Sequence, residues 1–286
     1  MAYTDINGIG IAYDLLGDPG APAVVITPGG RFPRDTQGVP QLAEQLVASG
    51  RQVLLWDRPN CGGSDICFDA PSESGMQCDA LVGLLRELDL GPVAMLGGSG
   101  GSRIALLAAA AAPELVSHLS VWWISGGPIS LAQLAAYYCG DSAMAAARGG
   151  MEEVAALPGW REQIERNPKN REIILAQDAN AFIERMQQWA AAYAYSETSP
   201  VPGMGPAEFA RLAMPTMIFR SGQSDISHTR RTSEWVHEMI AGSQLVEPPW
   251  PDQEWNNCSK IPLEPGRGRF ERWPLLAPQL LDFLNR

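Results

Sequence analysis

The chain has 286 residues, of which 45% are hydrophobic and 19% charged, so it can bury a large core and is expected to be globular. Collagen-like and disordered classes are excluded by this composition. Acidic residues outnumber basic ones by 32 to 21, and the sequence pI is about 4.8. A nucleic-acid partner is therefore not expected.

Membrane, secretory and metal signals are not found in the sequence. The apolar run Ile104–Ala112 is far shorter than the roughly 18 residues that a membrane helix needs. Met1–Gly10 lacks a basic segment followed by an apolar one, so no secretory signal is expected. Five cysteines without CxxC spacing fit reduced thiols, and three separated histidines do not suggest a metal site. We expect a cytoplasmic protein that does not associate with a membrane.

The order of strand-like and helix-like segments predicts an α/β fold. Short apolar runs that indicate buried strands occur at Ala23–Thr27, Gln52–Trp56, Val93–Leu96, Leu119–Ile124, Thr216–Arg220 and Gln244–Glu247. Apolar residues at helical spacing occur at Pro40–Ser49, Ser72–Leu88, Ser102–Ala112, Thr232–Ile240 and Leu275–Leu284. Strands that alternate with helices form mostly parallel sheets with helices on both faces. Asp5–Asp18 is interpreted as a polar opening, and Pro248–Trp273 as an irregular stretch long enough to be functional.

The alternation stops after Gly127, where the sequence favours several helices rich in alanine, methionine and aromatic residues. We interpret residues 128–206 as a helical cap, inserted into a core formed by residues 1–127 and 207–286. The candidates for an apolar pocket are Trp122, Trp123, Trp160, Phe182, Met186 and Trp189. Of these, Trp123, Trp160 and Trp189 are expected to contact the substrate, although such aromatic residues more often serve core packing.

The sharpest motif is Gly97-Gly98-Ser99-Gly100-Gly101, a Gly-x-Ser-x-Gly sequence between a predicted strand and a predicted helix. A serine in such a tight turn has a strained backbone, and glycines two residues to either side relieve the crowding. The turn presents the serine hydroxyl at the carboxyl edge of the sheet, above the positive end of the helix. Ser99 is therefore predicted to be a nucleophile. A plain glycine-rich helix start or a phosphate-binding turn is the alternative, although no Walker lysine follows.

With these features the chain resembles the α/β-hydrolase superfamily over almost its whole length. Thr27-Pro28-Gly29-Gly30 stands where that family carries its His-Gly oxyanion loop, and Asp57–Asp65 resembles its DxxGxGxS turn. The resemblance implies an oxyanion hole made by the backbone amides of Gly30 and Gly100, which would stabilise the intermediate of acyl transfer. Pro28 replaces the family's usual histidine, and this change removes a side chain but no donor.

The resemblance also implies the acid of a catalytic triad and draws attention to a missing base. Ser221–Asp225 resembles the loop that delivers the acid, so its aspartate would orient an imidazole; capping the following helix is the alternative. The family's histidine is expected after the last strand, yet none follows His237. Matching forward from that strand places the expected position at residues 252–253, and matching backward from the final helix places it at residues 266–267.

Three histidines are available to replace that base. His118 precedes a strand at the end of the sheet away from Ser99, and His237 lies in a helix pattern, so both are interpreted as structural. His228 follows Asp225 by three residues in a loop at the carboxyl edge, and it is our first hypothesis for the base.

Other mechanisms stay open at this point. Asp252 or Glu254 would serve as the base if burial raised its pKa. Alternatively, Ser99 is not a covalent nucleophile, and the protein is a lyase, a cofactor-free carbonyl enzyme or a ligand-binding protein. Cys61 is a weaker candidate, because a free thiol is inert unless its pKa is lowered.

The leading hypothesis is a serine hydrolase that cleaves an ester, lactone or thioester of a small, largely apolar carbonyl compound. Its triad would be Ser99, Asp225 and His228, with Gly30 and Gly100 in the oxyanion hole. No cofactor or metal is expected. The expected partner is a small-molecule substrate, and assembly as a homodimer is left open.

Overall fold

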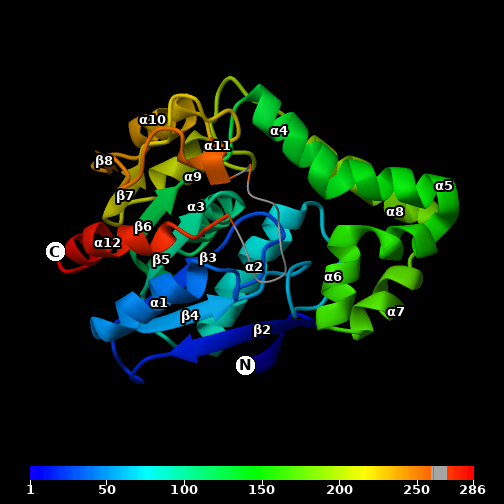
Figure 1. Ribbon diagram of the computed structural model, residues 1–286, viewed down its shortest axis with the longest axis horizontal. Helices are drawn as coiled ribbons and strands as arrows, with labels where there is room; N and C mark the ends of the chain where they lie inside the picture. Colours follow the sequence, from blue (N-terminus) through cyan, green and yellow to red (C-terminus); the bar gives the residue numbers. More distant parts are fainter. Residues whose placement is uncertain (259, 261–268) are drawn as a thin grey trace.

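The computed structural model describes residues 1–258, 260 and 269–286, and its strands form an eight-stranded sheet (Figure 1). The strands are β1 (Ala2–Ile6), β2 (Ile9–Leu16), β3 (Ala23–Thr27), β4 (Gln52–Trp56), β5 (Val93–Gly98), β6 (Val116–Trp122), β7 (Thr216–Phe219) and β8 (Gln244–Val246). Their order across the sheet is β1-β2-β4-β3-β5-β6-β7-β8. β2 pairs antiparallel with β1 and with β4, and the pairings from β4 through to β8 are parallel. The predicted, mostly parallel α/β sheet is confirmed.

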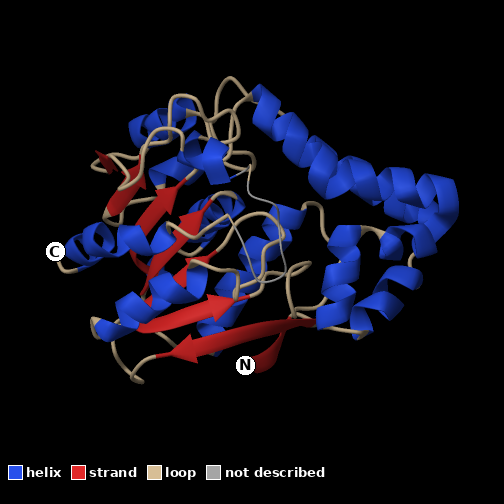
Figure 2. Ribbon diagram, viewed as in Figure 1, coloured by secondary structure: helices blue, strands red, loops and turns tan. Residues whose placement is uncertain are grey.

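Helices cover both faces of this sheet (Figure 2). They are α1 (Val39–Ala48), α2 (Glu73–Glu87), α3 (Gly100–Ala111), α9 (Pro206–Ala210), α10 (Arg230–Met239), α11 (Glu254–Cys258) and α12 (Ala277–Leu284), with short 3₁₀ turns at Pro113–Leu115 and Trp273–Leu276. Residues of α2, α3, α9 and α10 share one hydrophobic core, and residues of α1 and α12 share a second. Val25 of β3 belongs to the first core and Val24 to the second. Since successive residues of a strand point to opposite faces, a strand buried on both faces is apolar throughout.

The main difference from the sequence-based expectation lies at the start of the chain. Asp5–Asp18, interpreted as a polar opening, contributes to a hairpin of β1 and β2 at the edge of the sheet. Asn7 and Gly8 form its turn with φ values of 55° and 82°. Asn-Gly is the residue pair that such two-residue turns favour. This dipeptide therefore indicated a hairpin that the pattern of apolar runs alone did not reveal. The polar residues reflect an edge hairpin with one solvated face.

A layer of helices projects beyond the carboxyl ends of the parallel strands, on the right of Figure 1. It comprises α4 (Pro128–Ala135), a π-helical turn (Ala136–Gly140), α5 (Asp141–Ala156), α6 (Pro158–Arg166), α7 (Lys169–Leu175) and α8 (Ala179–Ala191). These residues, which we call the helical segment, form a third core together with Ile66 and Phe68 from the loop after β4. That this segment acts as a cap, with boundaries 128 and 206, stays a prediction.

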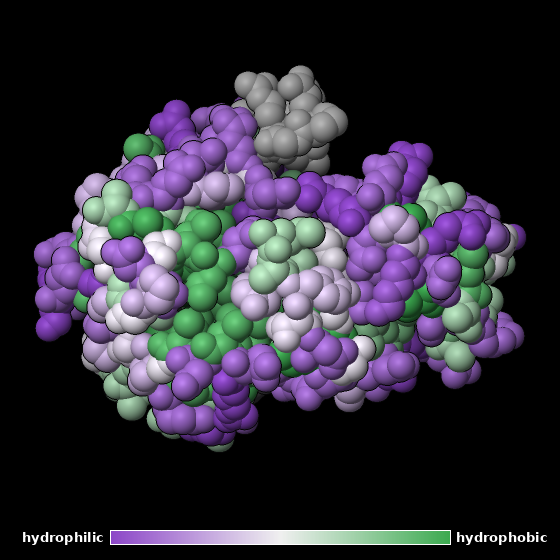
Figure 3. Space-filling view, turned by 90° about the horizontal axis from the view of Figure 1, so that it is seen from below, coloured by the Kyte–Doolittle hydropathy of each residue, from purple (hydrophilic) through white to green (hydrophobic). Residues whose placement is uncertain are grey.

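The surface seen from below in Figure 3 is mostly hydrophilic, with apolar side chains gathered on the half away from the helical segment. Within the part of the chain that the structure describes, no helix has both the length and the apolar character to cross a membrane. A homodimer stays a prediction.

Asn170 joins the helical segment to the sheet domain. Its side chain is fully buried, accepts a hydrogen bond from the backbone N–H of Ile66 (2.8 Å), and donates to the backbone oxygens of Ser64 (3.1 Å) and Gln163 (3.3 Å). One amide therefore satisfies three buried backbone groups from two parts of the chain. Buried polar groups of this kind are costly to leave unpaired.

We expect Asn170→Ala to lower the free energy of unfolding by about 1–3 kcal/mol, because it leaves buried backbone groups without partners. The matched control is Arg171→Ala, one residue along the same helix, whose ion pair with Glu152 is exposed and is expected to contribute less than about 1 kcal/mol. Urea unfolding of both variants measures the difference. Equal stability of the two would contradict the proposed anchoring role.

Candidate active site

Ser99 lies in a strained turn between β5 and α3. Its backbone has φ 54° and ψ −128°, a conformation that a non-glycine residue rarely adopts. A Cβ atom on Gly97 would stand 2.5 Å from the backbone oxygen of Gly101, and one on Gly101 would overlap the backbone oxygen of Thr27. Only glycine fits at these two positions, which agrees with the steric argument made from the motif.

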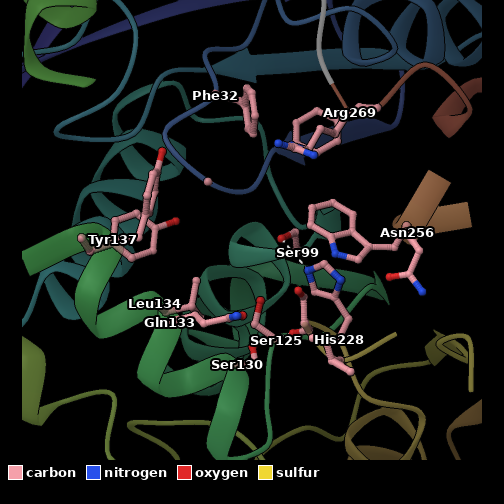
Figure 4. Close-up of a pocket in the computed structure, with 16 residues that line it drawn as sticks. Phe32, Ser99, Ser125, Ser130, Gln133, Leu134, Tyr137, His228, Asn256 and Arg269 are labelled. Atoms are coloured by element: carbon pink, nitrogen blue, oxygen red, sulfur yellow. Dashed lines mark hydrogen bonds between the residues drawn. The ribbon is translucent and has the colours of Figure 1, made fainter. Parts of the chain in front are cut away.

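Ser99, His228 and Asp225 form a hydrogen-bonded chain. The Oγ atom of Ser99 lies 2.9 Å from Nε2 of His228 (Figure 4). Nδ1 of His228 lies 3.1 Å from Oδ2 of Asp225. All three residues are buried, with exposed fractions of 9%, 2% and 4% in that order. If Nδ1 carries the proton and donates to Asp225, Nε2 is free to accept the serine proton. The structure thus brings together the three residues that were predicted as the triad.

The candidate acid and the candidate base belong to one loop, between β7 and α10. Oδ1 of Asp225 accepts the backbone N–H groups of Ser227 (2.9 Å) and His228 (2.8 Å), while Oδ2 faces the imidazole. The cap of α10 is Thr229, whose side chain accepts the backbone N–H of Thr232. Asp225 is therefore not the cap of that helix, and its carboxylate instead fixes both the loop and the ring.

Two tryptophans hold the imidazole of His228 from different sides. The ring of Trp123 stacks at 6.0 Å with an interplanar angle of 18°, and Trp255 meets it edge-on at 4.4 Å and 82°. Trp123 itself has a positive φ of 49°, just after β6. Trp255 comes from α11, in the segment where the family's histidine was expected. The indole packs against the base that another loop supplies.

The loop after β3 contacts the nucleophile closely. A Cβ atom on Gly29 would lie 2.5 Å from Cβ of Ser99 and 2.7 Å from the backbone nitrogen of Gly100. The backbone nitrogen of Gly30 and the hydroxyl of Tyr138 each lie 3.3 Å from the position that a Cβ on Gly100 would take. The amides predicted for an oxyanion hole are thus neighbours, with a phenol beside them.

Arg58 holds this loop in place. Its side chain is buried, and Nη2 donates to the backbone oxygens of Gly30 (2.6 Å) and Gly29 (3.3 Å). Because the carbonyl groups are engaged by the guanidinium, the backbone of the two glycines is held against Ser99. Arg58 belongs to the Asp57–Asp65 turn, but nothing in the sequence indicated its partner.

A cavity of about 390 Å³ opens onto Ser99 and His228. Its lining comprises Gly30, Phe32, Ser99, Ser125, Ser130, Gln133, Leu134, Tyr137, Tyr138, Ile226, Ser227, His228, Trp255, Asn256, Arg269 and Phe270. Figure 4 shows Ser99 between Phe32 and Arg269 on one side and Gln133, Leu134 and Ser130 on the other. The helical segment thus contributes to this cavity through α4 and the π-helical turn.

The predicted contacts of Trp123, Trp160 and Trp189 with substrate do not fit this lining, which includes none of the three. Trp160 and Trp189 pack around Phe68 in the core of the helical segment. Trp123 is 3% exposed and lies behind His228. Apolar periodicity identified buried aromatic residues, but it does not distinguish packing within helices from a cavity wall.

The site residues that the sequence analysis did not predict are Tyr138, Trp255 and Arg269. The Tyr137-Tyr138 pair early in the inserted segment was the one signal in the sequence that could have indicated Tyr138.

The alternative bases have other partners. Asp252 is exposed and pairs with Arg230 (2.8 Å), and its hydrogen bond from the backbone of Gln223 helps to lower its pKa. Glu254 is buried but interacts with Sγ of Cys258 (2.9 Å) and with Arg272 (3.2 Å). Neither lines the cavity beside Ser99, so neither is positioned as its base. Residues 266–267 lie outside the described residues.

The remaining candidates are also unsuited to this chemistry. Burial raises the pKa of the Cys61 thiol, which makes it a poor nucleophile. His118 lies in β6 opposite Ala94, at the far end of the sheet from Ser99, and His237 contacts Ser243 (2.8 Å). In the described part of the chain, no group of three or more histidine, cysteine or acidic residues could hold a metal ion.

Residues 22–121 match a family model described as the alpha/beta hydrolase fold. The chain is 43% identical over 76 residues to a 2-hydroxy-6-oxononadienedioate/2-hydroxy-6-oxononatrienedioate hydrolase of Cupriavidus pinatubonensis, covering 27% of this chain and 26% of that protein. It thus spans about a quarter of the length of this relative. It is 26% identical over 247 residues to the human serine hydrolase BPHL, covering 85% of this chain and 77% of that one.

Solved structures share the whole fold. One is an enol-lactonase from Burkholderia xenovorans LB400, with a TM-score of 0.59 and 18% identity, in which each chain is covered completely. At this identity the match concerns the fold alone. The matched family model includes the Ser99 turn and the Gly29–Gly30 loop but ends before Asp225 and His228. The chain therefore has the α/β-hydrolase fold.

Proposed function

We propose that the protein is a serine hydrolase that cleaves an ester, lactone or thioester of a small, largely apolar carbonyl compound. The observation that carries the proposal is the hydrogen-bonded chain from Ser99 through His228 to Asp225. Ser99, at one end of this chain, lines a cavity that a substrate could enter. A serine hydroxyl becomes an effective nucleophile when a positioned base takes its proton. The hydrolase names of the relatives point in the same direction.

The first half of the reaction forms an acyl-enzyme. Ser99 Oγ attacks the carbonyl carbon of the substrate while its proton passes to Nε2 of His228. The carbonyl oxygen becomes an oxyanion, which the backbone N–H groups of Gly30 and Gly100 would stabilise. Asp225 stabilises the imidazolium. The intermediate then collapses, the bond to the leaving group breaks, and the imidazolium gives its proton to that group.

The second half releases the acid. A water molecule loses a proton to Nε2 of His228 and attacks the acyl carbon, again forming an oxyanion. When this intermediate collapses, Ser99 Oγ leaves and takes the proton back from the imidazolium. The products are a carboxylic acid and an alcohol or thiol, or a single hydroxy acid where the substrate is a lactone.

Ser99→Ala tests the nucleophile directly. We expect a fluorophosphonate probe to add its mass to the wild-type protein and not to the variant, because the probe bonds only to an activated hydroxyl. Intact-protein mass spectrometry measures the adduct, and a thermal melt of the variant establishes that it is folded. A wild-type protein that stays unlabelled would rule out the proposed mechanism.

The base and the acid are tested together. We expect His228→Ala to lower kcat/KM for a hydrolysed ester by at least about 10³-fold, and Asp225→Asn by a comparable factor. Asparagine keeps an oxygen for the two backbone N–H groups, but its NH₂ would face Nδ1 and favour the wrong tautomer. His237→Ala is the control, since its ring contacts Ser243 outside the cavity. Full activity in His228→Ala would overturn the assignment of the base.

Tyr138→Phe tests whether the phenol assists the oxyanion hole. Its hydroxyl lies 3.3 Å from the position that a Cβ on Gly100 would take, so we expect kcat to fall by about ten- to one-hundredfold and KM to change less. Tyr137→Phe is the matched control, because this neighbouring residue also lines the cavity. An unchanged kcat in Tyr138→Phe would mean that the hydroxyl takes no part.

A further inference from the structure

We propose that the cavity beside Ser99 binds substrates that carry a carboxylate, and that Arg269 recognises this group. The inference deepens the proposed function and rests on it for the identity of the cavity as the substrate site. It changes the expected substrate from a largely apolar carbonyl compound to one with an apolar body and an anionic end.

The first observation is an unpaired guanidinium nitrogen. Nη1 of Arg269 is buried and has no hydrogen-bond partner among the described residues. A buried donor without a partner costs about 1–3 kcal/mol, and more when it belongs to a charged group. Arg58 and Arg103 also have buried nitrogens without a partner, but neither residue lines the cavity. Arg269 therefore presents a donor that the described part of the protein does not use.

The second observation is where this charge lies. Arg269 lines the same cavity as Ser99 and His228, and Figure 4 shows it on the side of Phe32. None of the described residues that line the cavity is acidic. An arginine side chain stays charged at neutral pH, so the described wall has a net positive character. An anion that entered this cavity would meet the guanidinium of Arg269, whose Nη1 has no partner, and no acidic side chain among the described lining residues.

The third observation concerns how the guanidinium is held. Its Cζ atom lies 5.8 Å from the ring centroid of Trp255, within the range of a cation–π contact. Trp255 in turn packs edge-on against His228 at 4.4 Å. The indole of Trp255 thus contacts both the guanidinium of Arg269 and the imidazole of His228. Through these contacts the proposed anion subsite lies next to the residue that is hydrogen-bonded to Ser99.

A carboxylate is the chemistry that fits this arrangement. The planar guanidinium fork donates two parallel N–H groups to a carboxylate, and such charge-assisted hydrogen bonds are stronger than neutral ones. The apolar side chains of Phe32, Leu134, Ile226 and Phe270 are also part of the cavity lining and suit a short hydrocarbon chain. We therefore expect monoesters of short dicarboxylic acids, or lactones that carry a carboxylate, to bind better than neutral analogues of the same length.

The test is first a binding measurement, which does not depend on turnover. Ser99→Ala protein is titrated calorimetrically with monomethyl glutarate and with methyl valerate, which have the same acyl chain length but differ in the terminal carboxylate. We expect the anionic ester to bind about ten- to one-hundredfold more tightly, the range for a hydrogen bond to a charged group. The preference should disappear when Arg269→Met is added and return in part with Arg269→Lys.

Arg272→Met serves as the matched control, because it removes a nearby arginine that is paired with Glu254 and does not line the cavity. Equal binding of the two esters, or a preference that survives Arg269→Met, would overturn the proposal. A preference that Arg272→Met abolishes equally would also overturn it, since the effect would then be general electrostatics.

A kinetic experiment separates this inference from the proposed function. The 4-nitrophenyl esters of the same two acyl groups are given to protein with Ser99 intact, and kcat/KM is measured for each. Selective binding without hydrolysis or fluorophosphonate labelling would overturn the hydrolase mechanism and support the anion subsite. Hydrolysis of both esters at equal kcat/KM, unaffected by Arg269→Met, would support the hydrolase and overturn the subsite.

Discussion

The candidate site depends on how a single carboxylate divides its two oxygens. Oδ1 of Asp225 accepts two backbone N–H groups of its own loop, and Oδ2 faces Nδ1 of His228. The two backbone hydrogen bonds to Oδ1 hold the loop in a tight turn. His228, only three positions after Asp225, can therefore direct its ring back toward the carboxylate. The proposed acid and base therefore come from one loop, while Trp123 and Trp255 from other segments pack against the imidazole. A change that removes both carboxylate oxygens affects the orientation of the imidazole and the conformation of the loop that presents it.

A second constraint is steric and acts on the nucleophile. Ser99 has a strained backbone, and the chain tolerates it because glycines stand wherever a Cβ would collide: Gly97 and Gly101 within the turn, and Gly29 in the loop opposite. This close approach is also what makes the amides of Gly30 and Gly100 neighbours. Arg58 then holds the opposite loop by its carbonyl groups. The strain is therefore balanced by contacts from three separate segments, which is typical of functional turns.

Much of this arrangement was predictable from local pattern. The central strands are buried on both faces, so apolar runs marked them, and Ala23–Thr27 and Gln52–Trp56 have the predicted bounds. The strand predicted at Leu119–Ile124 instead spans Val116–Trp122. The serine motif indicated its own strand and helix. Enumeration of three histidines left one at the correct edge of the sheet. By contrast, the partner of Arg58 and the unpaired state of Arg269 depend on contacts between distant segments. Trp160 and Trp189 were expected to line the cavity but lie in the core of the helical segment. Periodicity indicates that a side chain is buried but not what it is buried against.

The position of the base has a consequence for the last loop of the described sheet domain. In the family pattern that loop supplies the histidine, and its shape must then serve proton transfer. Here we propose that His228, from the loop after β7, is the base, so no described residue after β8 is needed for that task. The segment after β8 contributes Trp255 against the imidazole and Arg269 beside the cavity. The described part of this segment thus forms a wall of the cavity and does not supply the proposed base. Because no imidazole has to be placed there, a charged group such as Arg269 can line the same cavity as Ser99.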